Sequence, residues 1–173
     1  MSEIKLVEAA VNGDLESFGV LCEKYYPALV AIACSVLEDH HLAQDATQSS
    51  FAKALVALPG LRNRKRFGPW LRRICRNMAM DMAAGNKRHI AGRDISQIQA
   101  VQKTDQSTEA VREAVAVLSP GEREIIYLRY YNRMSYKQMT DILGLSKPAI
   151  NGRLKRIKVK IAEHLKQNGF TEI

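Results

Sequence analysis

Residues 135–165 read SYKQMTDILGLSKPAINGRLKRIKVKIAEHL, and this stretch decides the fold of the second half of the chain. Ser135 and Gln138 have the spacing of a capping box, which predicts the start of a short helix. Gly144 predicts the turn that ends it, and Ser146 predicts the N-cap of a longer helix. The apolar residues of that longer helix recur at three- and four-residue steps, which places them on one face. They are Ile150, Leu154, Ile157, Ile161 and Leu165.

A short helix, a tight turn and a basic amphipathic helix are typical of a helix-turn-helix, whose second helix enters the major groove of DNA. Such a helix presents its first turns to base edges and holds phosphates with Lys or Arg on its flanks. By position, the candidates for the groove side are Lys147, Asn151, Gly152, Lys155 and Arg156. Arg153 and Lys158 are expected nearer the DNA backbone. The alternative is a solvent-exposed basic helix in a small bundle.

The rest of the chain is also helical in pattern. Ser119 and Glu122 form another capping box, with Pro120 at the first helical position. Asp14 suits the N-cap of a helix that Pro27 kinks or restarts. Further helices are expected over about 41–58 and 69–84, and no segment shows the alternation of a strand. We therefore expect an all-α protein.

A stretch of different composition separates the two sets of predicted helices. Residues 85–107 read GNKRHIAGRDISQIQAVQKTDQS, with few apolar residues and many Gln, Ser, Gly and Asp. We expect two helical domains, 1–84 and 108–173, joined by a flexible linker over 85–107. The alternative for the linker is a short docked turn formed by its isoleucines and Val101.

The distribution of charge favours a polyanionic partner. The 173 residues include 26 Lys and Arg against 18 Asp and Glu, a net charge of +8. Residues 1–58 carry a net charge of −5, whereas residues 59–84 carry +6 and residues 108–173 carry +5. A basic balance is typical of proteins that bind nucleic acid or a membrane surface. We find no membrane-spanning run and no signal peptide, and we expect a cytoplasmic protein without membrane insertion.

The sequence offers little support for a metal, cofactor or catalytic site. Cys22, Cys34 and Cys75 are widely spaced in apolar helical patterns, which indicates reduced thiols in the core. His40 and His41 lack a third ligand at helical spacing. No glycine-rich phosphate loop, nucleophile elbow or pair of clustered carboxylates is present. We therefore expect no metal, no cofactor and no enzymatic activity.

Longer phrases of the sequence resemble a known family. Residues 24–55 read KYYPALVAIACSVLEDHHLAQDATQSSFAKAL, residues 70–81 read WLRRICRNMAMD, and residues 118–165 add the second capping box and the helix-turn-helix. In this order they resemble the extracytoplasmic-function sigma factors, small two-domain members of the bacterial sigma-70 class. The resemblance implies a transcription initiation factor that binds core RNA polymerase. Its first domain would recognise and melt the −10 element of promoter DNA, its second would read the −35 element, and an anti-sigma factor would hold its free form.

The resemblance also implies a helix that docks on the polymerase. In the family an Asp-Ala-x-Asp-x-x-Gln phrase contacts a coiled coil of the largest polymerase subunit, and here the matching residues 42–51 read LAQDATQSSF. The contact would fall on Asp45 and Gln48, with Gln44 beside them and Phe51 in the core. Gln44 and Ser49 stand where the family commonly has acidic residues.

Residues 59–84, the basic strip with a net charge of +6, suit the melting of promoter DNA. Flipped bases need pockets and a displaced strand needs neutralising charge, so Arg or Lys, an amide and aromatic surface must lie close together. The base-capturing loop would consist of Arg62, Asn63, Arg64, Lys65 and Arg66. The helix beside it would contribute Arg72, Arg73, Arg76 and Asn77, and Asn77 matches a position at which the family contacts a −10 base. Trp70 falls on the apolar face, which favours core packing over stacking on a base.

Two other classes of function remain as alternatives. One is an autonomous helix-turn-helix regulator that needs no polymerase, which leaves the phrase around Asp45 and Gln48 unexplained. The other is an interaction protein or a nuclease. A nuclease needs clustered carboxylates to hold metal ions, and the basic regions lack them.

Overall fold

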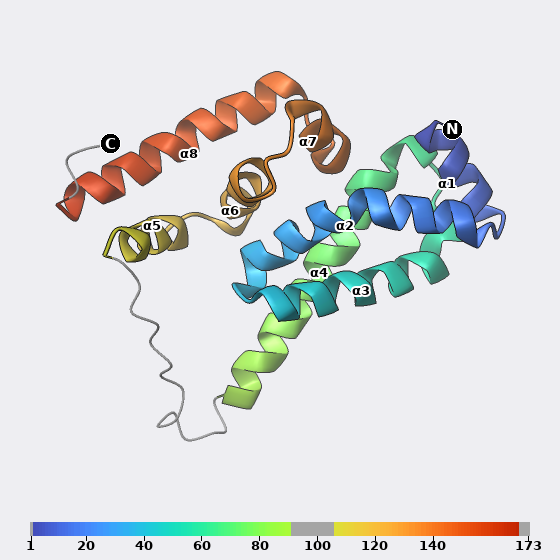
Figure 1. Ribbon diagram of the computed structural model, residues 1–173, viewed down its shortest axis with the longest axis horizontal. Helices are drawn as coiled ribbons and strands as arrows, with labels where there is room; N and C mark the ends of the chain where they lie inside the picture. Colours follow the sequence, from blue (N-terminus) through green and yellow to red (C-terminus); the bar gives the residue numbers. More distant parts are fainter. Residues whose placement is uncertain (1, 91–105, 170–173) are drawn as a thin grey trace.

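The computed structural model describes residues 2–90 and 106–169, and within these ranges it contains helices and turns but no strand. The all-α prediction is therefore confirmed. Figure 1 shows α1 to α4 gathered in one half of the molecule and α5 to α8 in the other. Most of the expected linker lies outside the described residues, and so does the docked turn that was its alternative.

Four helices build the first half. Their bounds are α1 Glu3–Val11, α2 Leu15–Leu37, α3 His40–Ala57 and α4 Phe67–Ile90, with 3₁₀ turns at Leu58–Gly60 and Arg64–Arg66. Asp14 caps α2 as expected, because its carboxylate accepts hydrogen bonds from the Glu16 amide at 3.1 Å and from the Ser17 hydroxyl at 2.6 Å. The Ser17 hydrogen bond also lowers the pKa of Asp14. Pro27 lies inside α2 without ending it, so the helix is not restarted there.

Two features of the first half differ from expectation. The short helix α1 was not predicted, and it packs on the core through Val7 and Ala10. Helix α4 runs from Phe67 to Ile90, longer than the expected 69–84. An isolated glycine weakens a helix by only about 1 kcal/mol relative to alanine, and no proline follows Gly85, so no strong signal ends the helix at residue 84.

The second half contains the predicted helix-turn-helix. The bounds are α5 Gln106–Ala116, α6 Pro120–Ile126, a π-helical segment η4 Tyr127–Tyr131, α7 Tyr136–Leu143 and α8 Lys147–Gln167. Both capping boxes form, at Ser119 with Glu122 and at Ser135 with Gln138. Gly144 ends α7 with a φ of 66°, a conformation that glycine adopts without strain. Ser146 then caps α8 by accepting a hydrogen bond from the Ala149 amide.

One continuous hydrophobic core joins the two halves. Leu29 and Ile32 of α2 belong to the same buried cluster as Ile125 of α6, Leu128 of η4 and Met139 of α7. A smaller cluster, made by Ala110, Ala114 and Leu165, holds α5 against α8. The apolar face predicted for α8 is confirmed, because its residues at 150, 154, 157 and 165 are buried and Ile161 is half-buried.

Close backbone packing accompanies this shared core. A Cβ at Gly68 of α4 would lie 2.4 Å from the backbone oxygen of Asp141 in α7 and 3.0 Å from the Tyr25 hydroxyl. A Cβ at Gly144 would lie 2.9 Å from the ring of Pro69. These two glycines let α4 and α7 approach one another more closely than larger residues would allow.

Helix α2 is long and apolar enough to span a membrane by length and composition, contrary to the sequence-based expectation. In the structure, 56% of the apolar 18-residue stretch of α2 is buried inside the protein. Its residues from Ala28 to Ser35 are all buried, so packing against the other helices accounts for its hydropathy.

The approach at Gly68 yields a stability prediction. Gly68→Ala should lower the free energy of unfolding by about 1–3 kcal/mol, the usual range for overpacking, because the new methyl group meets backbone that cannot move aside. Gly19→Ala is the matched control and should not lower the free energy of unfolding. A Cβ there meets nothing within 4 Å, and alanine suits the interior of α2. Urea denaturation followed by circular dichroism measures both. Equal stability of Gly68→Ala and the wild type would contradict the close approach.

Candidate nucleic-acid interface

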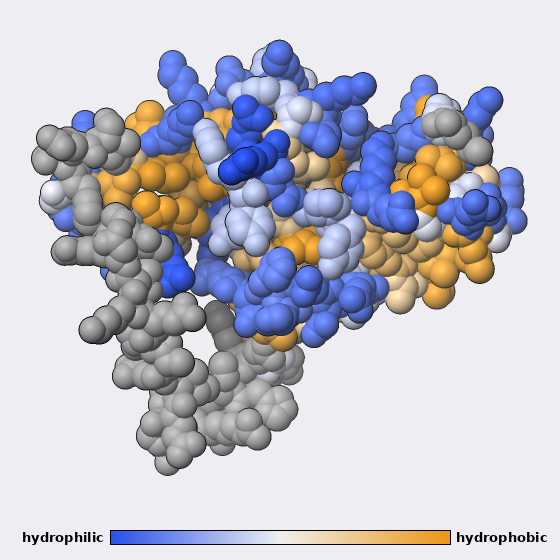
Figure 2. All heavy atoms as spheres, in the orientation of Figure 1, coloured by the Kyte–Doolittle hydropathy of each residue, from blue (hydrophilic) through white to orange (hydrophobic). Residues whose placement is uncertain are grey.

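The exposed side of α8 carries the residues that the sequence assigned to the −35 element. Ile150, Leu154 and Ile157 bury the opposite side of the helix, which fixes the direction of every other side chain. The assigned residues are all exposed: Lys147, Asn151, Gly152, Arg153, Lys155, Arg156 and Lys158. Hydrophilic side chains dominate the outer edge of the molecule where α8 lies (Figure 2). The structure thus exposes all seven residues, with Lys147, Asn151 and Lys158 beside α7 and η4 and with Arg153 and Arg156 beside the start of α6.

Two tyrosines of the preceding elements, Tyr136 and Tyr130, lie beside these residues and were not among the predicted site residues. The Tyr136 hydroxyl donates a hydrogen bond to Oδ1 of Asn151 at 3.2 Å. The Lys158 ammonium lies 5.6 Å from the ring centroid of Tyr130, and a hydrogen bond with Tyr130 raises the pKa of Lys158. Nothing in the local sequence pattern pairs these residues, because α7 and η4 meet α8 only through the tertiary fold.

The basic loop before α4, residues 62–66, is held by a hydrogen bond to the side chain of its own Asn63. The Oδ1 atom of Asn63 accepts a hydrogen bond from the Lys65 amide at 3.1 Å and so caps the 3₁₀ turn Arg64–Arg66. Arg64 is half-buried, whereas the other loop residues assigned to the −10 element are exposed: Arg62, Asn63, Lys65 and Arg66. The loop therefore presents several cations at one point of the surface.

On α4 the predicted −10 residues divide into two groups. Arg73 and Asn77 are exposed. Arg72 and Arg76 instead lie against Glu124 of α6, whose side chain is 1% exposed. Arg72 donates two hydrogen bonds to Glu124, one of them at 2.7 Å, and an Arg76 nitrogen lies 3.9 Å from the same carboxylate. The sequence analysis missed Glu124, since no local signal links positions 52 residues apart.

Further polar contacts hold the same two halves together. Arg123 of α6 donates a hydrogen bond to Glu38, at the carboxyl end of α2, at 2.6 Å. The amide of Asn132 donates to the backbone oxygen of Pro27, and the hydroxyl of Tyr131 lies 3.5 Å from Nδ1 of His40. With the Glu124 contacts, these bonds hold the second half of the chain against the first, while the side chains of Arg72 and Arg76 remain 24% and 31% exposed.

Trp70 lies on the apolar side of α4, as the sequence indicates. It is half-buried, packs against the core, and its ring centroid lies 5.8 Å from that of Phe67. Core packing therefore explains its position without a bound base.

Helix α3 presents the residues that the family resemblance assigned to polymerase contact. Its inner face is buried at Ala43, Ala46, Thr47, Ser50 and Ala54. On the other face Asp45 and Gln48 are exposed, and Gln44 is half-buried. Phe51 is half-buried and packs against the core, in agreement with the expectation for it.

The three thiols of the chain are free, and their pKa values are raised. Burial raises the pKa of the Cys75 thiol to about 12 and that of the Cys22 thiol to about 11, which keeps both protonated. Cys34 is buried, and burial also raises its pKa. Across the residues that the structure describes, no three His, Cys, Asp or Glu side chains are grouped so as to hold a metal ion.

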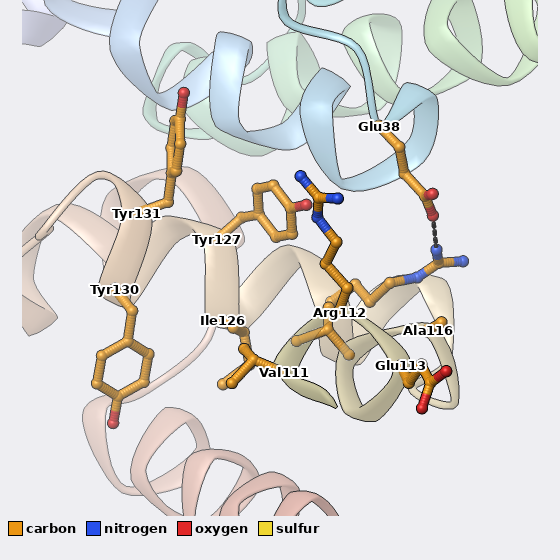
Figure 3. A pocket seen from close by; sticks show the side chains of 11 residues that line it. Glu38, Val111, Arg112, Glu113, Ala116, Ile126, Tyr127, Tyr130 and Tyr131 are labelled. Carbon is orange, nitrogen blue, oxygen red and sulfur yellow. Dashed lines mark hydrogen bonds and ion pairs between the residues drawn. The ribbon is translucent and has the colours of Figure 1, made fainter. Parts of the chain in front are cut away.

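A pocket of about 800 Å³ opens where α5, α6 and η4 meet the end of α2. Figure 3 shows the Arg123–Glu38 hydrogen bond at one side of it, with Val111 of α5 and the tyrosines of η4 lining the rest. Val111, Tyr130 and Tyr131 are roughly half exposed. None of the residues that the sequence assigned to DNA or polymerase lines this pocket.

Two family models match the chain, and together they cover most of it. The model described as Sigma-70 region 2 matches residues 21–89. The model described as Sigma-70, region 4 matches residues 108–161, which include the helix-turn-helix.

Curated relatives carry the same kind of name. The chain is 26% identical over 170 residues to the probable RNA polymerase sigma factor RfaY of Xanthomonas campestris, covering 91% of this chain but 42% of that protein. It is 22% identical over 179 residues to the ECF RNA polymerase sigma factor SigW of Bacillus subtilis, covering 94% of this chain and 96% of that protein.

Solved structures agree with the fold. CnrH, in complex with the cytosolic domain of CnrY, matches with a TM-score of 0.62 and 25% identity over 96% of this chain and 99% of that one. The sigma factor RpoE of Bartonella quintana, in complex with the anti-sigma factor NepR, matches with a TM-score of 0.53 and 26% identity over 88% of this chain and 97% of that one. Two matched regions in the family's order, on an all-helical fold shared with these proteins, lead to one conclusion: the chain belongs to the extracytoplasmic-function sigma factors of the sigma-70 class.

Proposed function

We propose that this protein binds core RNA polymerase and directs it to promoters, where it recognises the DNA and assists its melting. The observation that carries the proposal is the exposed face of α8, on which basic and amide side chains stand opposite an apolar face buried at Ile150, Leu154 and Ile157. A helix built in this way can enter a major groove while its scaffold stays intact. Residues 108–173 are accordingly assigned to the −35 element.

Residues 1–84 are assigned to polymerase docking and to the −10 element, and residues 85–107 to the connection between the domains. The exposed Asp45 and Gln48 on α3 support the docking assignment, with Gln44 beside them. The cations of the loop from Arg62 to Arg66 support binding of the displaced single strand, where aromatic and cationic groups hold flipped bases. The chemistry of RNA synthesis belongs to the polymerase, so this chain needs no cofactor and acts wherever the polymerase acts, in the cytoplasm.

We also propose an anti-sigma factor as a partner. The support is the sigma factor RpoE of Bartonella quintana, which resembles this chain and was solved with the anti-sigma factor NepR. In the closed arrangement seen in the structure, the two halves pack against each other. A partner that binds this closed arrangement would keep Arg72 and Arg76 bound to Glu124.

The direct test is reconstitution with bacterial core RNA polymerase on a library of promoter fragments. We expect a stable complex and initiation at sites that core polymerase alone does not use. Sequence-specific binding to duplex DNA without any polymerase complex would favour the autonomous regulator instead. If the protein bound neither core polymerase nor duplex DNA, both the proposed function and the autonomous regulator would be rejected.

The first prediction from the proposed function concerns polymerase docking. Asp45→Lys reverses an exposed charge on α3 and should weaken binding of core polymerase by roughly tenfold or more, the size expected when like charges meet across an interface. Glu8→Lys makes the same change of charge at an exposed position of α1 and serves as the control. Fluorescence anisotropy of labelled protein titrated with core polymerase measures both. Equal affinity of Asp45→Lys and Glu8→Lys would contradict the docking assignment.

The second prediction separates phosphate contact from base readout on α8. Arg153→Ala, at an exposed residue expected nearer the DNA backbone, should weaken binding of all promoter sequences alike and reduce the slope of log K against log salt concentration by about one. Asn151→Ala should instead change which base is preferred at one position. Lys166 is exposed in the last turn of α8, and Lys166→Ala is the control that should change neither the salt dependence nor the base preference. An equal loss on every sequence after Asn151→Ala would argue against direct readout by Asn151.

The third prediction concerns the closed arrangement. Arg72 and Arg76 share Glu124 as a partner, and breaking a buried ion pair destabilises a structure by about 3–5 kcal/mol at most. Glu124→Ala should therefore weaken the packing of the two halves, with a larger radius of gyration in small-angle scattering and tighter binding of a single-stranded −10 oligonucleotide. Glu163→Ala removes an exposed carboxylate of α8 and should change neither. Unchanged size and affinity after Glu124→Ala would show that this contact does not hold the halves together.

A further inference from the structure

Tyr136 occupies a fixed position between the two helices of the helix-turn-helix. It is the first residue of α7, directly after the N-cap Ser135, whose capping box with Gln138 is complete. Its backbone oxygen accepts a hydrogen bond from the Thr140 hydroxyl at 2.7 Å. Its ring is half-buried and packs against the core. The direction of this side chain is therefore set by the fold rather than by solvent.

Two candidate DNA residues of α8, Lys147 and Asn151, lie against Tyr136 together with Arg129 of η4. Its hydroxyl donates to Oδ1 of Asn151 at 3.2 Å. The Lys147 ammonium lies 5.7 Å from its ring centroid, and the Arg129 guanidinium lies 4.9 Å from it. Arg129 is itself held by the backbone oxygen of Met134 at 2.6 Å. Tyr136 thus contacts both Lys147 and Asn151, the candidates nearest the start of α8, without being a candidate itself.

The hydrogen bond to Asn151 has a chemical consequence. A carboxamide carries an acceptor on one side and a donor on the other, and an exposed one can rotate to present either. When the Tyr136 hydroxyl binds Oδ1, the amide orientation is fixed, and Nδ2 and the second lone pair of Oδ1 stay available. Reading a base edge requires the donor and the acceptor to be presented in a defined order, as in the pairing of Asn with adenine. Fixing them beforehand reduces the entropy lost on binding.

We propose that Tyr136 is a positioning residue for base readout: it orients the Asn151 carboxamide so that this side chain discriminates one base of the promoter. This inference rests on the proposed function of α8 and names what sets its specificity. Tyr136 acts through Asn151, whereas the neighbouring lysines and arginines supply affinity that does not depend on sequence.

The test uses the full chain with core polymerase and a promoter library randomised over the upstream element. Asn151→Ala identifies the base position that depends on Asn151. Tyr136→Phe keeps the ring and its contacts with Arg129 and Lys147 but removes the hydroxyl. We expect Tyr136→Phe to reduce discrimination at that same position by about two- to tenfold, the range that one net hydrogen bond supplies. The double variant should lose no more than Asn151→Ala alone, because the two residues act as one unit.

Tyr130→Phe is the matched control, because Tyr130 also lies beside a lysine of α8 but its ring faces Lys158. It should leave base preference at the Asn151 position unchanged. Equal discrimination by Tyr136→Phe and the wild type would overturn the inference, and so would a loss spread evenly over all base positions, which a purely structural role predicts. A wild-type holoenzyme that selects no upstream sequence would overturn the proposed function and the inference together.

Discussion

The burial of the Glu124 carboxylate is the constraint on which the arrangement of the two halves depends. A buried charge must be paired, and the partners of Glu124 are Arg72 and Arg76 of α4, in the other half of the chain. Helix α6, which carries Glu124, also binds α8, because Glu122 accepts a hydrogen bond from Lys160 at 2.5 Å. This bond and the Ser119 amide lower the pKa of Glu122 to about 2, so the contact persists at neutral pH. One short helix therefore connects α4 to α8.

This connection gives two arginines of the basic strip alternative partners. In the structure Arg72 and Arg76 neutralise a carboxylate, and in the proposed function they neutralise DNA. The two states compete for these side chains, because Arg72 uses two of its five N–H donors on Glu124 and the Arg76 guanidinium lies 3.9 Å from the same carboxylate. The exposed residues of α8 carry no such conflict. Binding of DNA by Arg72 and Arg76 would thus be favoured by separation of the two halves, whereas the candidate residues of α8 are exposed without it.

Local signals explain which elements were predicted correctly. The capping boxes at Ser119 and Ser135 and the N-caps Asp14 and Ser146 all form as the sequence indicates, because a cap needs only residues within one turn. Helix α1 was missed, since its nine residues gain stability by packing rather than from a cap hydrogen bond. The end of α4 was placed too early because an isolated glycine is a weak stop.

The sequence by itself determined the helical class, the helix-turn-helix and the exposed candidates on α8, since periodicity and capping act over a few residues. The resemblance to sigma factors also came from the sequence alone. Only the tertiary structure decided that Glu124 covers Arg72 and Arg76, that Gly68 lies against α7, and that Tyr136 binds Asn151. Each of these contacts joins residues on different helices. Their proximity depends on how the helices pack, which no local pattern encodes.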